Sequence, residues 1–232
     1  MSPNPLPEPP SDYATLADFP ALAKERLPEI VYRVHQIRHD PEWFGSSGEA
    51  RWDPPEAAAG LFGTCYTGTD PVTAVIQAFG DLPVVTQETV DARAMAVIRV
   101  PRSLKLADMT SPSIVGRWRL DRRISTGDDY PVCQRWAYSL RLAGFGGIYY
   151  EPRHDPRGDG AASIALFADP GHQPRQMTVV GDERIHPLVT QEAESVFDLR
   201  IRPSSGLGAA GVVTFLGSQA TSTIAAVGAP AG

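Results

Sequence analysis

Two arginines and two tyrosines lie close together in the stretch formed by residues 28–81. Tyr32 and Arg33 belong to the segment VYRV, Arg51 to the segment ARWDPP, and Tyr66 to the segment TCYTGTD. A guanidinium held in one orientation binds phosphate oxygens through two parallel hydrogen bonds, and it also stacks on flat rings. A ligand that carries both phosphates and flat rings, such as a dinucleotide, therefore suits these side chains.

Short strands, a loop and a helix are expected to position this group. Residues 30–34 alternate in the manner of a β-strand, and residues 63–68 predict a second one. Residues 36–56 are rich in Asp, Pro, Gly and Ser and indicate a long loop, which in a compact domain is commonly functional. A helix is predicted over residues 71–79, because Asp70 is a good N-cap and proline is favoured in the first turn.

The rest of the chain predicts an α+β domain. We expect a helix over residues 12–26 with Asp12 as its N-cap, and another over residues 129–143 that ends at Gly144. Several short strands separated by only two or three helices favour α+β over a regular βαβ series. No glycine-rich phosphate loop joins a strand to a helix, so neither a Rossmann site nor a P-loop is predicted. The further strands are expected at residues 95–100, 104–108, 147–150, 163–167 and 177–180.

Three regions differ in composition. Residues 1–11 contain five prolines and predict a disordered or extended tail. Residues 12–200 are expected to form one folded domain. Residues 203–232 are rich in Gly, Ala, Ser and Thr with almost no charge, which favours a flexible appendage; a docked hairpin or a partner-binding tail is the alternative.

Composition and charge exclude several classes of function. The formal net charge of the 232 residues is −6 and no Lys/Arg cluster is present, so direct nucleic-acid binding is not expected. Cys65 and Cys133 have no metal-ligand spacing and are expected to be reduced core thiols; no metal site is predicted. No signal peptide and no membrane-spanning run are seen, which indicates a cytoplasmic protein.

The order and spacing of these segments resemble the RES domain family over about residues 25–180. The segment LPEIVYRVHQ resembles the opening strand of that family, with Arg33 at the arginine position and Tyr32 before it. DPEWFGSSGEARWDPP resembles the following loop, with Arg51 near its end. TCYTGTDPVTAVIQAF resembles the strand and helix that carry the tyrosine and the glutamate of the family, and DDYPVCQRWAYSLRLAGFGGIYYEPRHDP resembles the helix and strand that lead to its serine.

The resemblance implies a fold, a substrate and a partner. The fold is a RES domain similar to ADP-ribosyltransferases, with a central mixed β-sheet and a few flanking helices. NAD would be a substrate rather than a resident cofactor, and its cleavage would lead to hydrolysis, phosphorolysis or ADP-ribosyl transfer. Relatives are commonly toxins neutralised by an Xre-type antitoxin, which implies such a partner here. The residues assigned to NAD binding on this basis are Tyr32, Arg33, Arg51, Tyr66 and Arg153.

Two positions depart from the family pattern. Gln77 stands where the family has its acid, and Pro152 stands where its serine is expected, with Arg153 preserved after it. Glu151 is adjacent, so a local shift would bring a carboxylate near the pocket. The catalytic residues expected are therefore Gln77, Arg51 and Glu151.

Gln77 at the acid position is expected to weaken catalysis more than ligand binding. Cleavage of the nicotinamide–ribose bond develops positive charge on the ribose, as in glycoside hydrolysis. A preorganised carboxylate stabilises that charge, whereas Gln77 offers hydrogen bonds without charge. Two hypotheses stay open: a toxin-like NAD-degrading enzyme, or a catalytically weakened RES-fold protein that binds a nucleotide or a partner. For single residues, plainer roles also remain, such as core packing for Tyr66 and surface ion pairs for Arg33, Glu151 and Arg153.

Overall fold

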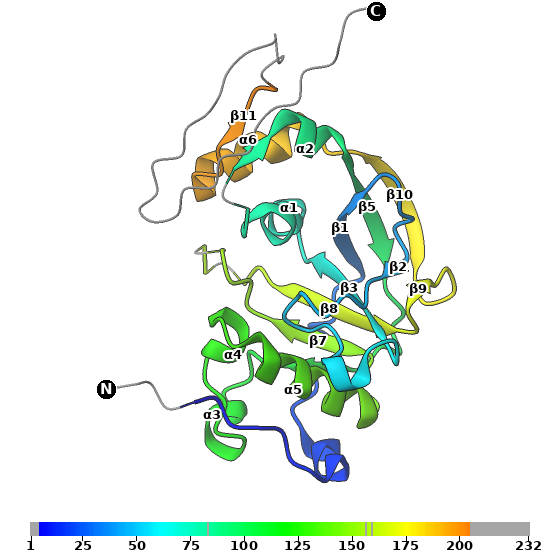
Figure 1. Ribbon diagram of the computed structural model, residues 1–232, viewed down its shortest axis with the longest axis vertical. Helices are drawn as coiled ribbons and strands as arrows, with labels where there is room; N and C mark the ends of the chain where they lie inside the picture. Colours follow the sequence, from blue (N-terminus) through cyan, green and yellow to red (C-terminus); the bar gives the residue numbers. More distant parts are fainter. Residues whose placement is uncertain (1–4, 83, 156, 159, 205–232) are drawn as a thin grey trace, which may run out of the picture.

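A seven-stranded mixed sheet forms the centre of the protein (Figure 1). The computed structural model describes residues 5–82, 84–155, 157–158 and 160–204. The strand order is β10-β5-β1-β3-β8-β7-β6, and every neighbouring pair is antiparallel except β6 with β7. The α+β prediction is confirmed. The strands are β1 (Ile30–Gln36), β3 (Gly63–Gly68), β5 (Arg93–Arg99), β6 (Leu106–Asp108), β7 (Gly147–Tyr150), β8 (Ser163–Ala168) and β10 (Thr178–Arg184).

Short helices and two small strand pairs surround this sheet. β2 (Trp43–Phe44) pairs with β9 (Gly171–His172), and β4 (Val85–Thr86) pairs with β11 (Ile201–Arg202). The α-helices are α1 (Pro71–Phe79), α2 (Gln87–Asp91), α3 (Ser113–Arg117), α4 (Arg123–Thr126), α5 (Tyr130–Leu142) and α6 (Pro187–Phe197), and the 3-10 helices are η1 (Tyr13–Asp18) and η2 (Glu56–Ala58). Among the described helices, none is long and apolar enough to cross a membrane.

One face of the sheet is shared by two helical groups. At one end, α5 and η1 cover a core that contains Trp52, Trp136 and Ile148. At the other end, α1 and α6 cover a second core around Val75 and Phe79. A third core packs on the opposite face of the sheet. Because α1 and the start of α5 lie over neighbouring parts of one face, side chains from both can meet between them (Figure 1).

Helix α1 begins where the sequence predicts and lies directly on the sheet. The Asp70 carboxylate accepts hydrogen bonds from the backbone N–H groups of Val72 (3.0 Å) and Thr73 (2.9 Å), and Pro71 occupies the first turn. Gly68 ends the preceding strand, and a Cβ at this position would lie 2.6 Å from the backbone nitrogen of Ala74. The absence of a side chain at Gly68 thus allows α1 to pack closely against β3.

The prediction of a helix over residues 12–26 is wrong beyond its first turns. Asp12 does cap a helix, since its carboxylate accepts from the N–H of Ala14 at 3.0 Å, but the helix is η1 and ends at Asp18. Pro20 has no N–H to continue it. The chain instead runs extended beside β6, where the N–H of Leu22 donates to the carbonyl of Leu106 at 2.9 Å.

Of the two alternatives predicted for the tail over residues 1–11, disordered or extended, residues 5–11 follow the extended one and pack on the domain. Leu6 is buried in the core under α5, and the indole N–H of Trp136 donates to the carbonyl of Pro7 at 2.9 Å. Glu8 pairs with Arg135 at 2.6 Å. The polyproline composition therefore produces an extended strap packed on α5. The predicted appendage over residues 203–232 lies outside the described residues except for its first two positions.

The contact between Gly68 and α1 can be tested by Gly68→Ala. The added methyl group would force α1 away from β3, so we expect the free energy of unfolding to fall by about 1–3 kcal/mol. Gly116→Ala is the matched control, because a Cβ at Gly116 meets nothing within 4 Å inside helix α3. That control should be neutral or stabilising by up to about 1 kcal/mol. Urea unfolding followed by circular dichroism measures both, and equal effects would contradict the close approach.

Candidate functional site

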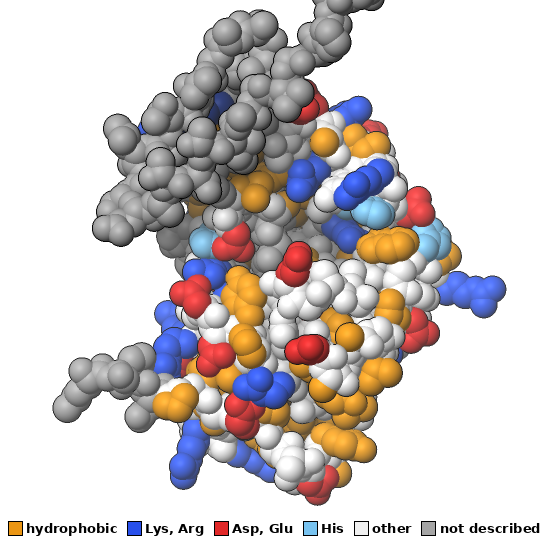
Figure 2. Space-filling view, viewed as in Figure 1, with side chains coloured by type: hydrophobic (Ala, Val, Ile, Leu, Met, Phe, Trp, Pro, Cys, Tyr) orange, Lys and Arg blue, Asp and Glu red, His pale blue; other side chains and the backbone are white. Residues whose placement is uncertain are grey.

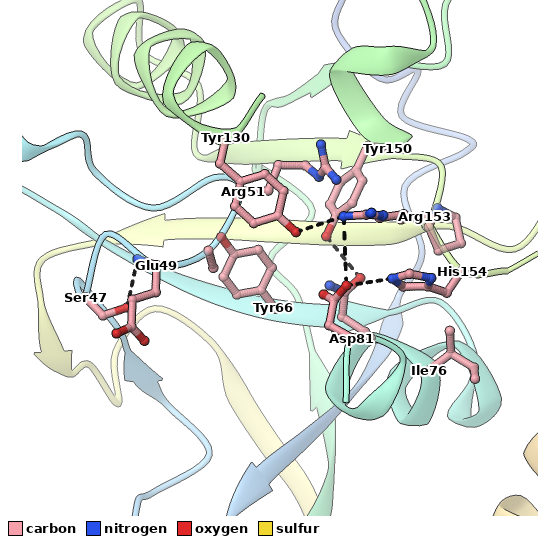
Figure 3. A pocket seen from close by; sticks show the side chains of 13 residues that line it. Ser47, Glu49, Arg51, Tyr66, Ile76, Asp81, Tyr130, Tyr150, Arg153 and His154 are labelled. Carbon is pink, nitrogen blue, oxygen red and sulfur yellow. Dashed lines mark hydrogen bonds and ion pairs between the residues drawn. The ribbon is translucent and has the colours of Figure 1, made fainter. Parts of the chain in front are cut away.

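A pocket of about 300 Å³ opens on the face of the sheet between α1 and the start of α5 (Figure 3). Its walls come from segments far apart in the sequence. The loop after β2 contributes Arg51, β3 contributes Tyr66 and α1 contributes Gln77. The remaining wall comes from the start of α5, the end of β7 and the loop that follows, which provide Tyr130, Tyr150, Arg153 and His154.

Arg51 is buried in this wall without a counter-charge. Arg51 is only 6% exposed, and its guanidinium lies 4.7 Å from the centre of the Tyr130 ring. Nη1 makes only long contacts, at 3.4 Å to the carbonyl of Ile124 and 3.7 Å to Sγ of Cys133. Nη2 is buried and has no hydrogen-bond partner among the described residues. A buried charge without a partner costs several kcal/mol, so an anionic ligand would supply what this guanidinium lacks.

The loop that carries Arg51 is held by the carboxylate of Asp53. One oxygen accepts from the hydroxyl of Tyr66 at 3.1 Å. The other accepts from Oγ of Ser47 and from the backbone N–H groups of Gly48 and Ala50, at 3.0 to 3.3 Å. Burial raises the pKa of Asp53 above its ordinary value in spite of these bonds.

Tyr66 joins this loop to the sheet and remains neutral. Its hydroxyl accepts from the N–H of Trp52 at 2.8 Å while it donates to Asp53. Burial, and next the nearby carboxylate of Asp53, raise the pKa of Tyr66 well above its ordinary value. The phenol is therefore a fixed, uncharged part of the wall between Arg51 and α1.

Gln77 is positioned by two hydroxyl groups. Its carbonyl oxygen accepts from Oγ of Ser163 at 2.6 Å and from the hydroxyl of Tyr150 at 3.1 Å. Burial raises the pKa of Tyr150 far above its ordinary value, so this hydroxyl keeps its proton. The amide NH₂ of Gln77 makes no hydrogen bond to the described residues and is left for a ligand acceptor.

An ionic cluster closes the far end of the pocket (Figure 3). Nε2 of His154 lies 2.8 Å from Oδ1 of Asp81, which lies two residues beyond the end of α1. Arg153 pairs with Asp128 at 2.5 Å and lies 3.9 Å from the same oxygen of Asp81. Arg153 also donates to the hydroxyl of Tyr130 at 3.4 Å. The cluster ties the loop after β7 to both α1 and the start of α5.

A family model of the RES domain matches residues 30–187. The chain belongs to the RES domain family. The fold is similar to that of a chain in the crystal structure of the M. tuberculosis MbcT–MbcA toxin–antitoxin complex, with a TM-score of 0.59 and 18% identity, covering 80% of this chain and 98% of that chain. Among curated proteins, no sequence matches this one. The resemblance inferred from the sequence is confirmed at the level of family and fold.

The pocket between α1 and the start of α5 brings together four of the residues that the resemblance assigns to the site. Arg51, Tyr66, Gln77 and Arg153 all line it. They come from three segments of the resemblance, because Tyr66 and Gln77 share the segment TCYTGTDPVTAVIQAF. In the described part of the chain, no group of three or more His, Cys, Asp or Glu side chains is arranged to hold a metal ion.

Three other predicted residues lie elsewhere. Successive side chains of a strand point to opposite faces, and in β1 this places Arg33 on the face away from the pocket, where its guanidinium donates to the carbonyl of Pro41. Tyr32 is on the pocket face but does not reach the pocket lining. Glu151 follows the inward-pointing Tyr150, forms a two-bond pair with Arg122 at 2.9 and 2.5 Å, and lines a separate cavity of about 600 Å³. The geometry therefore does not support Arg33 or Glu151 as ligand-contacting residues.

Sequence reasoning missed several residues of the site. Ser163 is the first residue of β8, is fully buried and donates to Gln77. In the strand GIYY, alternation shows that only one of Tyr149 and Tyr150 can face the pocket, without showing which. Asp53 carries no motif at all, because its role depends on how the loop folds back.

Arg51→Met tests whether the buried guanidinium serves a ligand or the fold. Replacing an unpaired buried charge by an apolar chain should leave the free energy of unfolding unchanged or raise it by up to about 2 kcal/mol. Inorganic pyrophosphate should raise the melting temperature of the wild type and not that of the variant.

Arg26→Met is the contrasting arginine substitution. Arg26 pairs at 2.7 Å with Asp108, whose side chain is only 5% exposed. Its loss should lower stability by about 1 kcal/mol, because Asp108 loses a charged partner. Destabilisation by Arg51→Met of equal or greater size would assign Arg51 to the fold alone.

The pKa of Asp53 predicts a dependence of stability on pH. Because burial raises this pKa in the folded protein, the stabilisation linked to its proton is fully present below the unfolded pKa, about 4, and is lost as the pH rises through the folded pKa. The free energy of unfolding of the wild type, relative to Asp53→Asn, should therefore fall as the pH is raised from about 4 and level off towards neutrality. Urea unfolding at a series of pH values measures this difference, and a constant or rising difference would contradict it.

Proposed function

We propose that this RES-domain protein binds NAD in the pocket and cleaves the bond between nicotinamide and ribose. The observation that carries the proposal is the buried, unpaired guanidinium of Arg51 beside the rings of Tyr66 and Tyr130. An arginine fork matches the oxygens of a pyrophosphate, and aromatic faces suit nicotinamide and adenine.

The size of the pocket supports partial burial of the substrate. A cavity of about 300 Å³ is at the small end of the range for ligand sites. It suits the nicotinamide ribose end of the dinucleotide, while the adenosine end extends along the open side. In this arrangement Arg51 binds the pyrophosphate, and the free NH₂ of Gln77 donates to an oxygen of the ribose.

The reaction needs charge stabilisation more than proton transfer. Nicotinamide leaves as a neutral base, and the ribose carbon develops positive charge that is relieved by attack of an acceptor. Water, phosphate and an ADP-ribosyl acceptor are the alternatives for that step. Gln77 holds the ribose but supplies no charge, which favours a second candidate function, a RES-fold protein that binds NAD with little turnover.

We also propose a toxin-like role with a protein partner. The fold is similar to that of a chain in a complex described as toxin–antitoxin, and the resemblance to the RES family implies a partner of the Xre type. Such a partner would act by covering the opening of the pocket.

Nicotinamide release decides between the two candidate functions. Purified protein is incubated with NAD, with and without phosphate, and nicotinamide is measured by chromatography, while calorimetry measures NAD binding. Release that is lost in Arg51→Met supports cleavage. Binding without release supports the second candidate, and the absence of binding contradicts both.

Gln77→Glu should raise the rate of nicotinamide release by about tenfold or more. A carboxylate oxygen can accept the same two hydrogen bonds from Ser163 and Tyr150, so the geometry is kept while a charge is added. Removing one preorganised group of this kind costs about 100 to 1,000-fold in other enzymes, and the gain should lie at or below that range. The exposed Gln176 provides the control Gln176→Glu, which should leave the rate unchanged. An unchanged rate in folded Gln77→Glu would show that residue 77 does not face the reacting ribose.

A further inference from the structure

A carboxylate lies one helical turn beyond Gln77. Helix α1 ends at Phe79, but Gly80 keeps right-handed helical backbone angles (φ −61°, ψ −26°) and its N–H donates to the carbonyl of Ile76 at 2.8 Å. Residues four apart on a helix lie on the same face. Asp81 therefore follows Gln77 along the pocket wall, and both line the cavity (Figure 3).

The contacts of Asp81 leave one of its oxygens available. His154 and Arg153 both approach Oδ1, at 2.8 and 3.9 Å. Oδ2 makes no hydrogen bond to the residues that the structure describes. Arg153 has its short ion pair with Asp128 at 2.5 Å, so its charge is matched mainly there. The carboxylate of Asp81 is thus oriented by His154 and still able to accept from a ligand.

The other carboxylates near the pocket are committed or distant. Asp53 already accepts four hydrogen bonds from its own loop and from Tyr66. Glu49 lies at the opposite end of the pocket from Asp81 and His154 (Figure 3). Glu151 is paired with Arg122 outside it. Among the described acids, Asp81 is the one placed beside Gln77.

We propose that Asp81 supplies the carboxylate that Gln77 lacks, with His154 as its positioning residue. The inference rests on the proposed cleavage of NAD. The bond between the ribose carbon and nicotinamide breaks, and its electron pair leaves with the nicotinamide nitrogen. Asp81 stabilises the positive charge that forms on the ribose. In the hydrolytic case a water oxygen then bonds to that carbon, and its proton passes through Asp81 to solvent.

Asp81→Asn is the central variant. Nicotinamide release should fall by about 100 to 1,000-fold in kcat, whereas the dissociation constant for NAD should change by no more than a few-fold, because the amide keeps the hydrogen-bonding shape. Asp18→Asn is the matched control, since the Asp18 side chain is 69% exposed and paired with one arginine, compared with 66% for Asp81. That control should retain the wild-type rate.

The double variant, Gln77→Glu with Asp81→Asn, gives a measurement that distinguishes a catalytic role of Asp81 from a purely structural one. If residues 77 and 81 serve the same purpose, their effects are not additive. Gln77→Glu should therefore raise the rate by a larger factor in Asp81→Asn than in the wild type. His154→Gln should lower kcat less than Asp81→Asn does, because it disturbs only the orientation of the carboxylate.

The outcomes separate this inference from the proposed function. A wild type that releases nicotinamide together with an equally active Asp81→Asn overturns the role of Asp81 and leaves NAD cleavage standing. A loss in Asp81→Asn that appears wholly as weaker NAD binding, or strictly additive effects in the double variant, also overturns it. A wild type that releases no nicotinamide overturns the proposed function and this inference with it.

Discussion

The carboxylate of Asp53 is the contact on which the pocket depends. It collects donors from Ser47, Gly48 and Ala50 and from the hydroxyl of Tyr66, so the loop after β2 closes on itself and is fastened to β3 at the same time. The closed loop fixes the position of Arg51, and its guanidinium is buried in the pocket wall beside Tyr130 without a counter-charge. Strain or unmet charge of this kind persists only where the surrounding structure over-determines it. The buried, unpaired guanidinium lowers the stability of the fold, but it leaves a cation in the pocket wall.

The two helices that face each other across the pocket are fixed by separate local devices. The cap at Asp70 and the missing side chain at Gly68 set where α1 starts and how closely it lies on β3, which together decide where Gln77 points. Asp129 caps α5, and the loop after β7 is tied to both helices through Arg153 and His154. Each helix is therefore fixed by residues close to it in the sequence, and the site forms only when the folded chain brings the helices together.

This division explains what the sequence could predict. Elements set by local sequence are predicted well, because capping aspartates and terminal glycines act over a few residues. α1 and β3 have the predicted bounds, and α5 differs from its prediction by one residue at each end. Features that depend on tertiary contacts are not predicted. Residues 5–11 look like a free polyproline tail until Trp136 and Arg135 provide partners. The resemblance to the RES family implies Arg33 in the pocket and Glu151 near it, but the alternation of side chains in β1 places Arg33 on the opposite face of the sheet. Glu151 follows the inward-pointing Tyr150 and pairs with Arg122 outside the pocket. The sequence does not show the role of Ser163, because its partner Gln77 is distant in the chain. It does not show the role of Asp53 either, because the contacts of Asp53 form only once its loop folds back on itself and onto Tyr66.

The surroundings of Gln77 show how the charge of a site can move without loss of its shape. Ser163 and Tyr150 both donate to one oxygen of the amide, and that pair of donors would serve a carboxylate oxygen equally well. The hydrogen bonds around residue 77 are thus the same for an acid or an amide, whereas the electrostatic potential at the proposed ribose site is not. The carboxylate of Asp81 follows about one turn further along the chain, where His154 and Arg153 both approach its Oδ1. Under the proposed role of Asp81, position and charge, which one side chain combines in the family pattern, are divided between a residue of α1 and a residue just beyond its C-terminal end.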